Sequence, residues 1–94
     1  MNLEKSKKRI AKKVKMGFQG YPEISIAYLG CSSDRADEVI LTFVADEGVQ
    51  AMEETFKSEL DAREDEAIQS AIVKMIERSE AKTVVLIEGV KPIL

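Results

Sequence analysis

The chain has 94 residues, 45% of them hydrophobic and 33% charged, a composition typical of one globular domain and not of a disordered segment. It contains no histidine, which excludes Ser-His and Cys-His catalytic pairs and histidine metal sites. No apolar run approaches the roughly 18 residues of a membrane span, and no apolar stretch follows the basic N-terminus as in a secretory signal. The single cysteine, Cys31, predicts a reducing, cytoplasmic location.

The net charge of −3 conceals an uneven distribution along the chain. Residues 1–16 hold seven basic residues against Glu4 alone, a net charge of +6. Residues 17–94 hold seven basic and sixteen acidic residues, a net charge of −9, with the acids densest between residues 46 and 66. Such an asymmetry bears on partners and solubility and not on the fold.

Residues 1–16 are predicted to form a basic helix that Asn2 caps and Gly17 ends. At about 100° per residue one narrow apolar stripe results, which Lys7 interrupts. Its members are Leu3, Ile10 and Val14. The opposite side carries six basic residues, the candidate partner-binding set: Lys5, Lys8, Arg9, Lys12, Lys13 and Lys15.

Two strands are predicted next, over residues 23–29 and 38–45, joined by a loop as an antiparallel hairpin. The stretch Val39–Val44 is apolar on both of its faces, which indicates an interior strand that needs cover on each side.

The segment after Asp46 is predicted to form two helices, over residues 47–60 and 62–79. The first carries a helical stripe of Val49, Met52, Phe56 and Leu60, and the second one of Ile68, Ala71, Ile72, Met75 and Ile76. A break near Asp61–Asp65 would bring both stripes onto one sheet. The alternative is one long helix from Glu47 to Ser79.

Residues 82–88 are predicted to form a third strand, interior because it is apolar on both faces and parallel to a neighbour because it follows a helical crossover. A short apolar tail, residues 90–94, follows it. The expected fold is therefore a single two-layer α+β domain, α-β-β-α-α-β, with a small mixed three-stranded sheet.

This order of elements resembles that of type II KH-like domains, which often bind RNA. In KH domains a glycine-rich loop between two helices clamps the nucleic-acid backbone. The corresponding place here holds Asp61-Ala62-Arg63-Glu64-Asp65, which lacks glycine and carries three acids. Since those acids would repel phosphate, no RNA site is expected there.

Few residues suggest catalytic chemistry. Cys31 could be a reactive thiol whose thiolate Arg35 stabilises, but a lone thiol without a base is more often an ordinary loop cysteine. A second set of side chains could bind a divalent cation, yet it lacks the spacing and glycine of an EF-hand. This set is Asp61, Glu64, Asp65 and Glu66. We therefore expect no catalytic residue, cofactor or metal, and a protein that is not an enzyme.

The basic helix has three interpretations. It can be a solvated face, which can also lean against the acidic stretch 46–66 of the same or a neighbouring chain. It can be a nucleic-acid-binding arm, although it lacks aromatic residues for base stacking. A membrane-surface helix is disfavoured because no Trp or Phe lies within it.

Two later helices can cover only one face of the sheet, so the other face needs the first helix, the tail or a partner. The sequence thus predicts a non-enzymatic binding domain that forms a homodimer or docks another protein. The alternative is a nucleic-acid-binding module that uses the basic helix.

Overall fold

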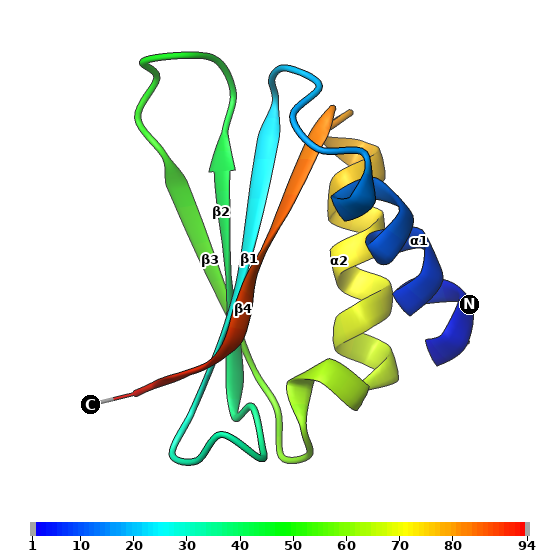
Figure 1. Cartoon of the computed structure of the whole chain (residues 1–94), viewed down its shortest axis with the longest axis vertical. Coiled ribbons are helices and arrows are strands. Elements are labelled where there is room, and N and C mark those ends of the chain that lie inside the picture. Colours follow the sequence, from blue (N-terminus) through cyan, green and yellow to red (C-terminus); the bar gives the residue numbers. More distant parts are fainter. Residues whose placement is uncertain (1, 94) are drawn as a thin grey trace.

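The computed structural model describes residues 2–93, which form two helices packed against one sheet (Figure 1). Its elements in chain order are α1 (Leu3–Lys15), β1 (Glu23–Gly30), β2 (Glu38–Val44), β3 (Met52–Lys57), the 3-10 helix η1 (Ala62–Glu64), α2 (Glu66–Arg78) and β4 (Thr83–Pro92). The predicted two-layer α+β class with a mixed sheet is confirmed. Met1 of the predicted first helix and Leu94 of the predicted tail lie outside the described residues.

The sheet has the strand order β3-β2-β1-β4, one strand more than predicted. β1 pairs antiparallel with β2, as expected for a hairpin, and parallel with β4. β2 pairs antiparallel with β3 on its other side. The interior position predicted for Val39–Val44 is therefore confirmed.

The prediction of a helix over residues 47–60 is wrong, because this segment forms a turn followed by the edge strand β3. Gly48 adopts a φ of +77° in that turn, a conformation that glycine reaches without strain. Methionine, glutamate and lysine favour helices, but a strand here also pairs the backbone groups along the outer edge of β2. The observed order is α-β-β-β-α-β, so both the KH-like order and the single helix Glu47–Ser79 are wrong as well.

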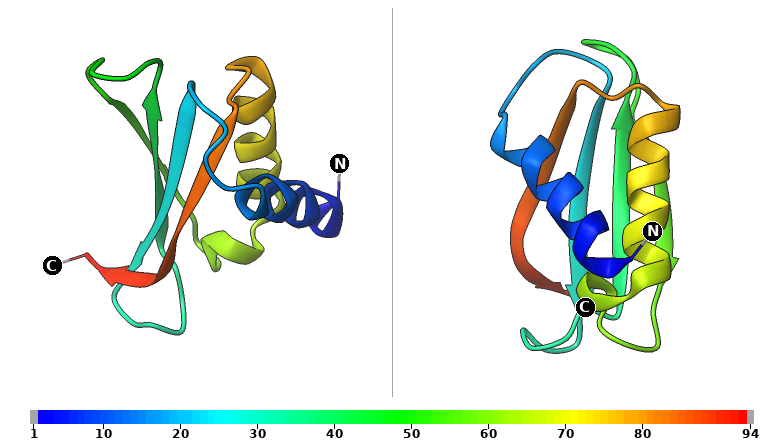
Figure 2. Two further views of the ribbon diagram at one scale, coloured as in Figure 1. Left: turned by 45° about the horizontal axis from the view of Figure 1, so that its top comes forward. Right: turned by 90° about the vertical axis from the view of Figure 1, so that its right-hand side faces the viewer.

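The predicted strand 82–88 is present as β4 and is parallel to β1, but it lies at the sheet edge and not in the interior. Its register with β1 shifts after the Ile26–Leu86 pair, and residues 87–89 form a bulge. Beyond the bulge the strand bends, and the C-terminal end leaves on the side of the sheet opposite the helices (Figure 1). The apolar residues on both faces of β4 therefore do not mark a central strand: one face is turned toward the helices, and no helix covers the other (Figure 2).

Helix α1 has the predicted ends. The Asn2 side chain accepts a hydrogen bond from the Lys5 backbone N–H at 2.9 Å, and Gly17 follows the helix with a φ of +72°. Ile10 is buried in the core, and Val14 packs partly against it, so the predicted apolar stripe does face inward. Docking this stripe onto the domain stabilises a helix that would be marginal alone.

Helix α2 begins at Glu66, later than the predicted residue 62. The Asp65 carboxylate accepts hydrogen bonds from the backbone N–H groups of Ala67 at 3.0 Å and Ile68 at 3.3 Å, which fixes the start of the helix. Ile68, Ile72 and Ile76 of its predicted stripe are buried.

Both helices lie on the same face of the sheet (Figure 2). They cover alternate strand residues, which are buried: Ile24, Ile26 and Tyr28 of β1, Val39 and Leu41 of β2, and Val84 of β4. Because successive side chains of a strand point to opposite faces, the remaining strand residues lie on a face that no helix covers.

Candidate interaction surfaces

The six predicted partner-binding residues of α1 divide into two groups. Lys5, Lys8, Lys12 and Lys15 are exposed and fall within about 80° of the helix circumference, over a length of about 15 Å. Within residues 2–93 none of these four, here called the lysine stripe, forms an ion pair. The structure thus leaves the lysine stripe available to an anionic partner.

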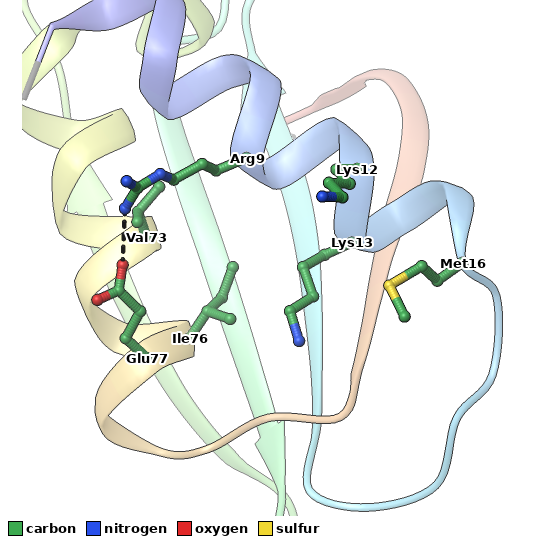
Figure 3. A pocket seen from close by; sticks show the side chains of 7 residues that line it. All are labelled: Arg9, Lys12, Lys13, Met16, Val73, Ile76 and Glu77. Carbon is green, nitrogen blue, oxygen red and sulfur yellow. Dashed lines mark hydrogen bonds and ion pairs between the residues drawn. The ribbon is translucent and has the colours of Figure 1, made fainter.

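Arg9 and Lys13 instead point toward the second helix and the connection that follows it. The Arg9 guanidinium forms an ion pair with Glu77 of α2 at 3.2 Å, and the Lys13 ammonium donates a 3.4 Å hydrogen bond to the Ala81 carbonyl (Figure 3). Lys7, on the other flank, pairs with Glu64 at 2.6 Å, and this hydrogen bond raises the pKa of Lys7. These contacts attach α1 to the domain, so part of the basic set acts within the chain.

A shallow groove of about 240 Å³ lies between the C-terminal halves of the two helices (Figure 3). Val73 and Ile76 form its apolar floor, and Met16 stands at its side. The groove is smaller than the roughly 300–1,000 Å³ of most ligand pockets. The Arg9–Glu77 ion pair also lies among its lining residues. It is therefore a weaker candidate than the surfaces around it.

Three of the four carboxylates that suggested a cation site have structural partners. Asp61 binds the Arg63 guanidinium at 2.6 Å and 2.9 Å, Glu64 pairs with Lys7, and Asp65 caps α2 while it accepts a hydrogen bond from Ser58. No group of three or more metal-binding side chains gathers within residues 2–93. The segment thus shapes the connection between β3 and α2.

Asp61 predicts a pH dependence of stability. The hydrogen bond from Arg63 lowers the pKa of the Asp61 carboxyl from 3.8 to about 2. The stabilisation is therefore complete above pH 4 and disappears as the pH falls toward 2. Full burial would make this shift worth about 2.5 kcal/mol, but the pair is partly exposed and screened. We expect Asp61→Asn to lower the free energy of unfolding by about 1 kcal/mol at pH 7.

Urea unfolding of the wild type and Asp61→Asn at pH 7 and pH 2 checks this expectation. Asparagine keeps an oxygen that can accept the Arg63 backbone N–H, so the comparison isolates the charge. The two proteins should converge in stability at pH 2. A difference that stays constant between the two pH values would contradict the ion-pair explanation.

Cys31 lies exposed in the loop between β1 and β2. Its backbone N–H donates to the Asp37 carboxylate at 3.1 Å. Arg35, the residue suggested to stabilise a thiolate, instead pairs with Asp37 at 3.3 Å and donates to the carbonyls of Glu59 and Leu60. This guanidinium therefore joins the loop to the segment after β3.

The uncovered side of the sheet, here called the open face, carries apolar residues from three strands. Val85 and Ile87 of β4 are 39% and 36% exposed, although both are large aliphatic residues. Four half-buried residues accompany them: Ala27 and Leu29 of β1, and Ile40 and Val44 of β2. Apolar residues that gather on one uncovered face mark an interaction surface more often than scattered single residues do.

The two edges of the sheet are protected in different ways. β3 carries Glu53, Glu54 and Lys57, and charges of this kind disfavour pairing with another strand. The start of β4 is covered by the loop before β1, because Thr83 donates a hydrogen bond to the Gly20 carbonyl and accepts one from the Gln19 N–H. Its later part is interrupted by the bulge. A partner is therefore expected on the open face and not along an edge.

Sequence reasoning missed the part of the open face that β3 contributes. Glu53, Thr55 and Lys57 lie on it, opposite Thr42, Ile40 and Glu38 of β2. The available signal was the turn residues Asp46-Glu47-Gly48, which interrupt the predicted helix.

Comparison with known proteins adds no assignment. No protein-family model matches the chain, and neither a curated protein nor a solved structure is significantly similar to it. Neither helix within residues 2–93 has both the length and the apolar composition that crossing a bilayer requires.

Proposed function

We propose that this chain is a cytoplasmic, non-enzymatic interaction domain that binds protein through its open face. The observation that carries the proposal is the position of α1. The sequence left open whether the first helix covers the second face of the sheet, and α1 instead packs beside α2 on the first face (Figure 2). Apolar residues of β1, β2 and β4 therefore stay accessible to a partner.

Site-specific photo-crosslinking in cells that express the chain tests this proposal. A photoreactive amino acid is placed at Thr42, near the centre of the open face, and separately at Lys8 on the outer side of α1. We expect a discrete protein adduct, identified by mass spectrometry, from Thr42 and none from Lys8. The absence of any Thr42 adduct, or the same adducts from both positions, would count against the proposal.

Binding of a nucleic-acid backbone is a second candidate function, favoured by the lysine stripe. Four exposed lysines without ion-pair partners in the described chain follow one line along α1, as a phosphate-binding helix requires. The net charge of −9 over residues 17–94 opposes it, so we rank it below the open face.

Salt dependence distinguishes this candidate. If all four lysines contact phosphates, the affinity for a labelled duplex should fall with salt with a logarithmic slope of about −3.6. Lys8→Glu/Lys12→Glu should then weaken binding at least about tenfold. Lys74→Glu/Lys82→Glu makes the same charge change at other exposed lysines and should weaken it far less. Fluorescence anisotropy measures both, and salt-insensitive or undetectable binding would exclude this function.

A further inference from the structure

The open face changes across its strands, from β4 and β1, where apolar residues lie near the centre, through a mixed β2 to a polar β3. On β4 and β1 the register places Val85, Ala27 and Leu29 on it, with Ser25 beside Val85, and Ile87 follows in the exposed bulge. On β3 it presents only polar or charged side chains, those of Glu53, Thr55 and Lys57. A partner that matches this face must therefore be apolar over β4 and β1 and polar over β3.

The same face is also divided along its strands by charge. At one end Lys57 of β3 and Lys91 of β4 flank Leu29 and Glu38, according to the register of the four strands. At the other end lie Glu23 of β1 and, closer to the centre, Glu53 of β3. One end thus carries a net charge of +1 and the other a net charge of −2.

We propose that the occupant of the open face is a second copy of this chain, packed face to face with its strands antiparallel to those of the first. This inference rests on the proposed function, since it names the partner for the same surface. A two-fold axis that lies between the sheets and runs across the strands sets β4 over β4 and β3 over β3 while it reverses the strand direction. The apolar sides then meet, and each lysine end lies over a glutamate end.

The other two-fold arrangement between these faces fails on both counts. An axis parallel to the strands would set the apolar β4 side over the polar β3 side. It would also bring lysine end onto lysine end and glutamate end onto glutamate end. Like charges placed opposite each other cost affinity. The pattern of the face therefore selects one symmetric dimer.

The size of the face predicts a weak dimer. Four strands about 4.8 Å apart and about seven residues long cover roughly 20 Å by 20 Å. Two such faces together measure about 800 Å², which is below the roughly 1,200 Å² at which stable specific interfaces begin. The last part of β4, which stays paired with β1, bends toward this side of the sheet and can add contacts to the second copy (Figure 1). We expect a monomer–dimer equilibrium at micromolar to millimolar concentrations.

Exchange of charges between two variants tests the arrangement. Lys57→Glu/Lys91→Glu makes both ends of the face acidic, and Glu23→Lys/Glu53→Lys makes both ends net basic. Sedimentation equilibrium should show that each variant dimerises at least tenfold more weakly than the wild type. Their equimolar mixture should form a heterodimer at least as tight as the wild-type dimer, because every acidic end then meets a basic end.

A matched control separates this effect from net charge. Lys5→Glu/Lys8→Glu changes the total charge as Lys57→Glu/Lys91→Glu does, but on the helix side of the domain. It should still form homodimers and should form no tight heterodimer with Glu23→Lys/Glu53→Lys. A heterodimer of equal strength in the control mixture would show that net charge drives association, and would overturn the proposed arrangement.

Other outcomes separate the dimer from the proposed function. Wild-type protein that stays monomeric up to millimolar concentration would overturn the dimer. The interaction function would still stand if Thr42 crosslinks to a different protein in cells, and it would fall if Thr42 forms no adduct. A wild-type dimer whose charge-exchanged variants fail to form a heterodimer would place the dimer interface elsewhere.

Discussion

Replacement of Ile72 with alanine should lower the free energy of unfolding by about 3–4 kcal/mol. Ile72 lies in the middle of α2 with no exposed surface, in the single core that also contains Ile24 and Ile26. The change removes three buried carbons and leaves a cavity that a sheet and two helices cannot easily close. A domain of this size has a total stability of about 5–10 kcal/mol, so the loss is a large part of it.

Urea unfolding followed by circular dichroism measures this effect. Lys74→Ala, two residues further along the same helix and exposed, should change the stability by less than about 0.5 kcal/mol. Since alanine has the highest helix propensity, a similar loss in both variants would mean that the cost does not come from core packing at Ile72. An unchanged Ile72→Ala protein would contradict the observed packing of α2 on the sheet.

Sequence patterns predicted those elements whose apolar residues repeat with one period and face one core. The stripes of α1 and α2 and the alternation in β1 and β2 are of this kind, and all four elements are present. β3 lacked such a pattern because it lies at an edge and buries little: Met52 is 69% exposed. Its structure depends on pairing with β2, a long-range interaction that local propensity does not contain.

How many other strands pair with a given strand also cannot be predicted from the residues of that strand alone. Val84–Ile87 and Val39–Val44 are both apolar on two faces, yet β4 lies at the edge and β2 in the interior. Two-sided apolar character describes the side chains on the two faces of a strand, and it carries no information about the strand's hydrogen-bonding neighbours. For β4 the open face explains that character.

The basic helix α1 shows that prediction from local sequence has the same limit for the candidate site. Its six basic residues were evident from the spacing of lysine and arginine in the sequence. Which of them are available to a partner depends on packing, since Glu77 of α2 pairs with Arg9 and Glu64 of η1 pairs with the intervening Lys7. Glu64 lies 57 residues from Lys7 in the sequence, and Glu77 lies 68 residues from Arg9. Only the folded structure therefore distinguishes the lysine stripe from the basic residues that attach α1 to the domain.

Gln69→Leu should lower the free energy of unfolding by about 2–3 kcal/mol although it keeps the volume of the side chain. The buried amide of Gln69 donates hydrogen bonds to the Tyr28 hydroxyl and to the Ala62 carbonyl, each at 2.9 Å. Leucine leaves both acceptors without this donor in the interior, and each costs part of its desolvation energy. Burial also raises the pKa of Tyr28, as expected for a hydroxyl held away from water.

A double-mutant cycle with Tyr28→Phe identifies the role of this hydrogen bond. Tyr28→Phe alone should cost about 1 kcal/mol, because it removes one acceptor of Gln69 but leaves the Ala62 carbonyl in place. Tyr28→Phe/Gln69→Leu has no Tyr28 hydroxyl, so no buried hydroxyl is left without a donor. The double variant should therefore be about 1 kcal/mol more stable than the sum of the single losses predicts. Strict additivity would mean that Tyr28 and Gln69 act independently. The connection of β1 to α2 would then depend on apolar packing alone. In that case the loss measured for Ile72→Ala would represent most of the energy that holds the helices on one face of the sheet and so leaves the open face uncovered.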